Sequence, residues 1–264
     1  FDIRGVEALQ GFWEEHYLDD PELNQKILEG DVQLFMDSME INAGGGFTHW
    51  AEDFAEEFEA RKGYDIRPYL FLLDSLGASH NAWSQTYRPM DALLSYRIDG
   101  DTNNEILYKI VFDYQDFLTD MFCERMFEPL REWLHSYGIE TRAQISYGRP
   151  FEMSNPIMYV DYPETENRVM YNQADMWRFW TGGSKLQNKV LSSETTAQSY
   201  SGYLFSDQMH LNDAYNQFAS GIQRTIWHIW SADYDYGATP QPYNETIPGW
   251  PVPGAGGSGF YKFG

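Results

Sequence analysis

The sequence has a single cysteine, Cys123, among 264 residues. One cysteine excludes a disulfide within the chain and any zinc site built from several cysteines. The histidines do not have the spacing of two ligands on one helix that is typical of zinc enzymes. They are scattered along the chain, for example at His49, His80, His135, His210 and His228. The sequence therefore indicates neither a disulfide scaffold nor a zinc enzyme.

Basic residues are also scarce. The chain has 18 Lys and Arg against 40 Asp and Glu, which gives a formal net charge of −22. Such a charge repels nucleic-acid phosphates and anionic membranes, and no run of about 18 apolar residues occurs that could cross a bilayer. We expect no nucleic-acid partner and no membrane insertion. The N-terminal stretch lacks the layout of a signal peptide, and we interpret Phe1 as a position inside a longer chain.

Aromatic residues, in contrast, are abundant: 9 Trp, 19 Tyr and 17 Phe make up 17% of the chain. Many of the tryptophans and tyrosines lie beside Gly, Asn, Asp or His in loop-like stretches. Aromatic rings suit the apolar faces of sugars, and neighbouring carboxylates and amides suit their hydroxyls. A sugar-binding surface and a large aromatic core are both consistent with this composition.

Helix-like and strand-like segments alternate along the chain. The helix-like segments are 6–29, 50–63, 104–137, 170–182 and 207–224, and the strand-like segments are 32–40, 139–148, 189–197 and 225–237. Asp20-Pro21-Glu22 is an internal helix start, and Gly63 and Gly138 are helix ends. Pro129 predicts a kink in the longest helix.

Strands that alternate with helices favour parallel βα units. We therefore predict an α/β fold of the (β/α)8 TIM-barrel type, of which this segment supplies only a part, because four strands are recognisable. At 264 residues the chain has a length that such barrels reach as one domain. Residues 1–264 are interpreted as a single catalytic barrel domain, a fragment of a larger multidomain chain.

Acidic residues follow the predicted strands, where a barrel places its active site. Asp37 and Glu40 end the first strand, just before the triple glycine 44–46; Glu152 follows the second strand and Glu194 ends the third. Glycoside hydrolysis requires a carboxylic acid and a carboxylate on opposite sides of the scissile bond. The pattern predicts a glycosidase with Glu40, Glu194 and Glu152 as candidate catalytic residues.

Each glutamate also has a plainer interpretation. Glu40 could form an ion pair with Arg61 or Arg67, and Glu152 with Arg149. Glu194 lies between uncharged neighbours, so it is either catalytic or hydrogen-bonded for structure. Glu140 begins its strand and is assigned to the opposite, stability end of the barrel.

Candidate sugar contacts lie near the same strand ends: Asp37, Trp50, Tyr147, His228 and Trp230. His228, within "IWHIW", could instead be a core histidine. Calcium is a candidate cofactor, because oxygen ligands are plentiful around Asp37 and in "SADYDYG". The carboxylates do not have the spacing of an EF-hand loop, and the metal ligands are left unassigned.

Four stretches resemble one known family when taken in order. They are "DSMEINAGGGFTHWAEDFAEEFEARKGYDIRPYL", "FDYQDFLTDMFCERMFEPLREWLHSYGIETRAQISYG", "SSETT" and "HIWSADYDYG" followed by "IPGWP". Together they are similar to the pattern of glycoside hydrolase family 106, the α-L-rhamnosidases, over roughly residues 30 to 255. The segment "INAGGGFTHW" is richer in glycine than that pattern, so the sugar bound there could differ.

The resemblance implies a catalytic barrel inside a larger enzyme, inverting chemistry with two glutamates, and a calcium ion at the sugar site. By position, Glu40 and Glu194 are the implied acid and base, in either order, and Glu152 is a third essential carboxylate or a residue beside the calcium. The expected substrate is a terminal α-L-rhamnosyl or related unit of a plant or microbial glycan, and the expected location is secreted, periplasmic or at the cell surface. A sugar-binding protein that keeps the aromatic cleft without hydrolysis is the alternative.

Overall fold

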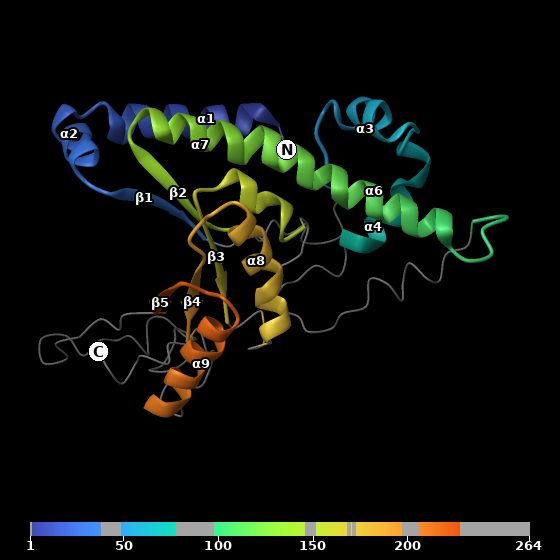
Figure 1. The fold of residues 1–264 in the computed structure, drawn as a ribbon. Helices are drawn as coiled ribbons and strands as arrows, with labels where there is room; N and C mark the ends of the chain where they lie inside the picture. Colours follow the sequence, from blue (N-terminus) through green and yellow to red (C-terminus); the bar gives the residue numbers. More distant parts are fainter. Residues whose placement is uncertain are drawn as a thin grey trace, which may run out of the picture. The chain divides into compact units, whose positions relative to one another are not determined.

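The computed structural model describes residues 2–37, 49–77, 98–145, 152–167, 170, 173–196 and 206–227 (Figure 1). The chain divides into two compact units, Phe1–Asp161 and Tyr162–Gly264. The assignment of all 264 residues to a single domain stays a prediction. None of the helices in the described ranges is long and apolar enough to cross a membrane.

The first unit begins with a helical layer. It consists of α1 (Ile3–Trp13), a π-helical turn η1 (Glu14–Leu18) and α2 (Pro21–Glu29). The Asp20 side chain accepts hydrogen bonds from the backbone N–H groups of Glu22 and Leu23, which confirms the helix start predicted there. Strands β1 (Val32–Met36) and β2 (Ile139–Gln144) pair in parallel, with Val32 opposite Ile139.

The interior of the first unit is aromatic and aliphatic. Helix α3 (Phe54–Lys62) ends at Gly63, whose φ of 83° suits glycine, and is followed by the short helix η2 (Arg67–Tyr69) and by α4 (Leu70–Gly77). Phe54 and Phe58 of α3 are fully buried against Phe117. Burial of three phenylalanine rings in one cluster removes a large apolar area from water and fixes α3 in place.

The longest helix is interrupted earlier than the sequence predicts. It runs as α6 (Glu105–Phe122), a π-helical segment η3 (Cys123–Phe127) and α7 (Glu128–Ser136). Pro129 cannot donate a backbone hydrogen bond, and its ring crowds the carbonyl of Arg125, four residues earlier. The widened π turn accommodates this conflict upstream of the proline, so that α6 and α7 continue as one rod in Figure 1.

The second unit alternates strands and helices. Its elements are β3 (Tyr162–Glu166), α8 (Ala174–Leu186), β4 (Ser192–Thr195), α9 (Asp207–Ala219) and β5 (Arg224–Trp227). Strand β4 pairs in parallel with β3 and with β5. The strand order within this unit, β3-β4-β5, is that of the sequence.

Strand β3 was missed by the sequence pattern. Its residues "YPETE" include a proline and two glutamates, which are depleted in strands. Strands β1, β2 and β4 lie within the predicted ranges, and β5 begins one residue earlier than predicted, at Arg224. The fold is thus a mixed α/β fold with five strands that agrees with part of a barrel; a complete (β/α)8 barrel is not present in the described ranges.

Candidate functional site

The structure describes four of the predicted site residues: Asp37, Trp50, Glu152 and Glu194. The remaining candidates lie outside the described residues: Glu40, the triple glycine 44–46, Tyr147, Arg149, His228 and Trp230. Their roles stay predictions. Two regions are therefore described separately: the ends of β3 and β4 in the second unit, and the chain around Trp50 in the first unit.

Glu194 has a carboxylate neighbour that the sequence analysis did not include. In the parallel register, Glu194 of β4 lies opposite Glu166 of β3. Two residues earlier on each strand, the side chains of Glu164 and Ser192 share one face of the sheet, because the Ser192 hydroxyl donates to Glu164 Oε2 at 2.7 Å. Side chains alternate between faces with a period of two, so Glu166 and Glu194 lie on this same face, on strands about 4.8 Å apart.

This carboxylate face is the one turned away from the helices. Thr195, next to Glu194, points to the other face, where its hydroxyl donates to Gln217 of α9 at 2.6 Å. Glu164 is fully buried, Glu166 keeps 6% of its surface exposed, and Glu194 is half-buried. In a barrel, the face opposite the helices is the interior, and its strand ends form the mouth.

Hydrogen bonds hold the ends of both strands. The backbone N–H of Asn167 donates to the Glu194 carbonyl at 3.2 Å, and the indole of Trp177 donates to the Glu166 carbonyl at 3.1 Å. The Asn167 side chain in turn donates to Asp213 of α9 at 3.1 Å. These hydrogen bonds hold the backbone at Glu166 and Glu194 in place.

Thr196, directly after β4, has an unusual backbone conformation. Thr196 has a φ of 66°, in the left-handed region that non-glycine residues rarely adopt. Thr196 is also fully buried. Glu194 is the second-last residue of β4, near the carboxyl end where the sequence analysis placed it.

Glu152 lies in a different local setting, in the first unit. Its carboxylate accepts from the Ser154 hydroxyl at 2.5 Å and from the backbone N–H of Asn155 at 3.0 Å, where the short helix η4 (Asn155–Tyr159) begins. Its own N–H donates to the Thr119 hydroxyl at 3.1 Å. These contacts give Glu152 a capping role, and its predicted catalytic role is untested.

Asp37 and Trp50 are both exposed. Asp37 directly follows β1, as predicted. The Trp50 ring stacks on Phe54, with ring centroids 4.5 Å apart and an angle of 26° between the planes. Trp50 keeps 38% of its surface exposed, so it combines a contact with the core and a surface open to a ligand.

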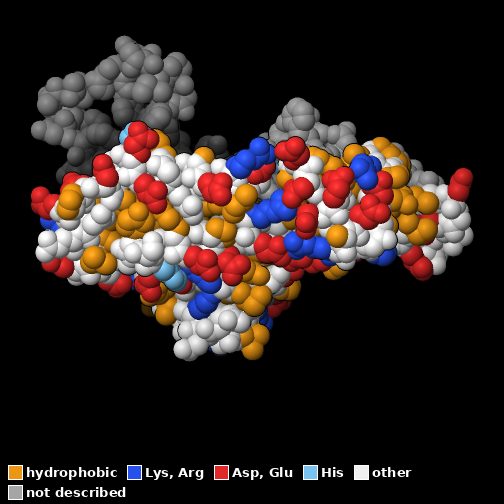
Figure 2. Space-filling view, turned by 90° about the horizontal axis from the view of Figure 1, so that it is seen from above, with side chains coloured by type: hydrophobic (Ala, Val, Ile, Leu, Met, Phe, Trp, Pro, Cys, Tyr) orange, Lys and Arg blue, Asp and Glu red, His pale blue; other side chains and the backbone are white. Residues whose placement is uncertain are grey.

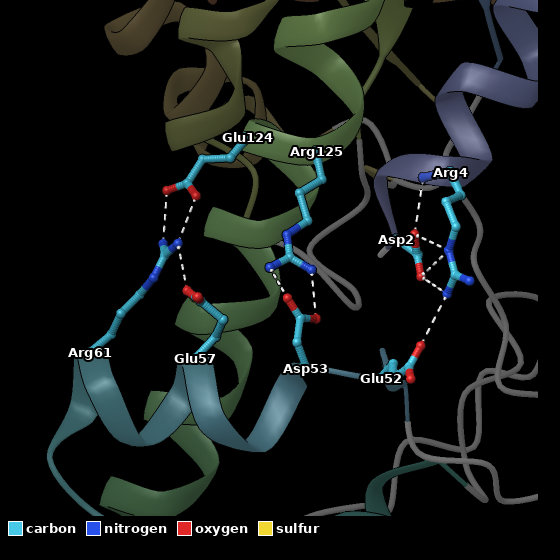
Figure 3. A network of polar contacts seen from close by, with 8 residues as sticks. All are labelled: Asp2, Arg4, Glu52, Asp53, Glu57, Arg61, Glu124 and Arg125. Atoms are coloured by element: carbon cyan, nitrogen blue, oxygen red, sulfur yellow. Dashed lines mark hydrogen bonds and ion pairs between the residues drawn. The ribbon is translucent and has the colours of Figure 1, made fainter.

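Charged residues of the first unit form a network on the surface. Figure 2 shows acidic and basic side chains interspersed on the face it displays, and Figure 3 shows the network itself: Asp2, Arg4, Glu52, Asp53, Glu57, Arg61, Glu124 and Arg125. Arg61, named above as an alternative partner of Glu40, contacts both oxygens of Glu124 at 2.8 Å and also Glu57. Arg67, the other alternative, contacts Asp65 and Glu56.

Within the described residues, neither the Cys123 thiol nor a cluster of metal-binding side chains forms a further candidate site. Burial raises the pKa of the Cys123 thiol, which makes it a poor nucleophile. Within the described ranges, no group of three or more His, Cys, Asp or Glu side chains has the geometry to hold a metal ion. Glu164, Glu166 and Glu194 do supply carboxylate oxygens, the donor type that calcium prefers.

Comparison with known proteins identifies the fold. No family model and no curated protein matches the chain. Among solved structures, the structure of rhamnosidase from Novosphingobium sp. PP1Y is similar, with a TM-score of 0.55 and 17% sequence identity. The similarity covers 84% of this chain and 20% of that chain, so the chain spans about a fifth of that rhamnosidase. The likeness shows that the chain shares its fold with part of that structure.

Proposed function

We propose that this chain is part of the catalytic barrel of a glycoside hydrolase that removes terminal α-L-rhamnosyl or related units from plant or microbial glycans. The observation that carries the proposal is Glu194, which lies near the carboxyl end of β4 on the carboxylate face, beside Glu166. The likeness of the fold to part of a rhamnosidase structure supports this reaction class.

The proposed reaction is hydrolysis with inversion. One glutamate of the pair Glu40 and Glu194 protonates the leaving glycosidic oxygen, and the other takes a proton from the water that attacks the anomeric carbon. The two carboxyl groups would stand about 6.5–9.5 Å apart to admit that water. Glu152 remains in the proposal as a third essential carboxylate.

The proposed sugar contacts are Asp37, Trp50, Tyr147, His228 and Trp230. Calcium is proposed as a ligand of the sugar site, where carboxylate oxygens would hold it beside substrate hydroxyls. We further propose that the chain works within a larger secreted, periplasmic or surface enzyme, together with its flanking domains.

The test is hydrolysis of p-nitrophenyl glycosides, with α-L-rhamnoside first, by the complete protein that contains this chain. Glu40→Gln and Glu194→Gln should each lower kcat/KM by about 10²- to 10⁴-fold, the usual contribution of a general acid or base. Glu140→Gln is the matched control, because Glu140 is the second residue of β2 and lies near the amino end of its strand, whereas Glu194 lies near the carboxyl end of β4. Treatment with EDTA tests calcium in the same assay.

Either outcome is informative. Turnover of the rhamnoside that both substitutions abolish, with Glu140→Gln unaffected, supports the proposal. Sugar binding without turnover of any glycoside would contradict it and would favour the binding protein named above as the alternative.

A further inference from the structure

Trp50 is an exposed aromatic residue built onto the core. Its partner in the stack, Phe54, is fully buried and packs edge-on against Phe117 at 4.9 Å. Tyr114 also lies against Phe54, with ring centroids 5.7 Å apart. One side of the Trp50 indole is therefore supported by the buried ring of Phe54, while 38% of the residue stays exposed.

The backbone on both sides of Trp50 is tied to the long helix. Directly before it, the His49 carbonyl accepts a hydrogen bond from the Tyr114 hydroxyl of α6 at 3.0 Å. Three residues after it, Asp53 accepts two hydrogen bonds from Arg125 of η3, at 2.8 and 2.7 Å (Figure 3). Such a two-bond Arg–carboxylate pair fixes orientation as well as distance.

Both anchors keep the chemical form that the contact needs. Burial raises the pKa of the Tyr114 hydroxyl, so the group stays a neutral donor. Hydrogen bonds from Arg125 lower the pKa of Asp53, so this residue stays a carboxylate. The two anchors therefore persist over the ordinary working range of pH.

We propose that Tyr114 and Arg125 are positioning residues that hold Trp50 as a sugar-binding platform. The inference rests on the proposed function, in which Trp50 contacts the substrate. A sugar ring stacks on an indole only when the indole plane faces it, and ordering a mobile residue on binding would cost affinity. Anchors at residues 49 and 53 make that arrangement before the sugar arrives.

A double-mutant cycle on the complete protein tests the proposal. Trp50→Ala should raise KM for the p-nitrophenyl glycoside about five- to tenfold, the order of one aromatic contact, with kcat within about twofold. Tyr114→Phe removes only the hydroxyl and should raise KM about two- to threefold. In the Trp50→Ala background, Tyr114→Phe should change KM no further, because it acts through Trp50.

Three further variants separate positioning from general loss of stability. Tyr64→Phe is the matched control: its hydroxyl donates to Asp113 of α6 at 3.0 Å rather than to residues 49–53, so KM should stay at the wild-type value. Arg125→Lys keeps the charge but not the paired geometry. Arg125→Ala removes both hydrogen bonds to Asp53. The KM of Arg125→Lys should fall between those of the wild type and Arg125→Ala.

Additive effects of Trp50→Ala and Tyr114→Phe on KM would overturn the proposal, as would an effect of Tyr64→Phe equal to that of Tyr114→Phe. A wild-type protein that hydrolyses no glycoside would instead remove the proposed function. The same cycle, measured as dissociation constants for L-rhamnose, would then decide the role of the anchors: coupled losses of affinity support it, and unchanged or additive values overturn it.

Discussion

In the first unit the buried interior is mainly apolar, with Asp101 and Asp113 as buried acids, whereas the second unit buries carboxylates, hydroxyls and amides around β3 and β4. Phe54, Phe58 and Phe117 represent the first kind of interior, and Glu164, Ser192 and Gln217 the second. An apolar core tolerates shifts of a few tenths of an ångström, but a buried polar group must keep its hydrogen-bond partner. The polar interior of the second unit is therefore the part of the molecule where geometry is most closely specified.

The largest expected effect tests the apolar side of this comparison. Phe117→Ala should lower the free energy of unfolding by about 4 kcal/mol, because it leaves a cavity at the centre of the cluster. Urea denaturation measures the change. Phe112→Ala, on the same helix but 66% exposed, is the control and should change stability by less than about 0.5 kcal/mol. Equal losses in the two variants would show that the aromatic cluster does not stabilise the first unit.

The second prediction separates function from structure on the carboxylate face. Glu166→Gln should lower kcat/KM by about 100-fold, or about 2.7 kcal/mol, because it removes the carboxyl group beside Glu194. Glu164→Gln should stay within about threefold of the wild type, since the amide still offers an oxygen to Ser192. Steady-state kinetics of both variants decide the matter. Equal losses of activity and of melting temperature would mean that the two carboxylates only keep the strands folded.

The third prediction concerns a glycine of the second unit that lies close to Thr181. Gly221 has a φ of 101°, and a Cβ there would come within 2.4 Å of Thr181 Cγ2. Thr181 cannot easily yield, because its hydroxyl donates to the Ser220 carbonyl at 2.8 Å. Gly221→Ala should therefore cost about 2 kcal/mol, measured as the urea midpoint at constant m-value.

Gly182→Ala is the control for that measurement. Gly182 lies within α8, and a Cβ there would have no neighbour within 4 Å. It should stabilise the protein by about 0.5–1 kcal/mol. A neutral Gly221→Ala would show that the polar unit is less closely packed than its hydrogen bonds imply.

The smallest expected effect is a dependence on pH in the first unit. Burial alone would raise the pKa of Asp161, but hydrogen bonds from Thr141 and His135 outweigh it and lower this pKa. The stabilisation is therefore complete above the unfolded-state pKa of about 3.9 and is lost as the pH falls through the lowered folded-state value. Asp161→Asn should cost about 1 kcal/mol near neutral pH.

The measurement is a series of urea unfolding curves between about pH 7 and pH 2. The wild type and Asp161→Asn should converge toward the acid end of that range. A difference that stays constant with pH would show that the side chain acts by shape rather than by charge.

The two units also differ in how far the sequence predicts them. Asp20, Gly63 and Gly138 mark helix ends by local chemistry, and the structure confirms all three. Strand β3 could not be recognised from propensity, because Glu164 and Glu166 favour a strand only through partners on β4. The one available signal was the period-two spacing of Tyr162, Glu164 and Glu166.

The candidate site follows the same division. Glu194 was predicted from its position at a strand end, and the structure places it near the carboxyl end of β4. Its pairing with Glu166 depends on strand register, and the anchor between Tyr114 and His49 joins residues 65 positions apart. Neither could be read from local pattern, because both are set by tertiary packing.

The π-helical segment Cys123–Phe127 sets the rotation of α7 about the helix axis relative to α6. Each residue advances an α-helix by about 100° and 1.5 Å, so the extra residue in the wide turn decides which side of α7 follows a given side of α6. Deleting one residue there would restore regular α-helical winding but would rotate Leu130 and Leu134, both fully buried, out of the interior. The same rotation would carry Trp133 away from Glu14, which its indole contacts at 2.6 Å. The number of residues in this segment therefore matters as much as which residues they are.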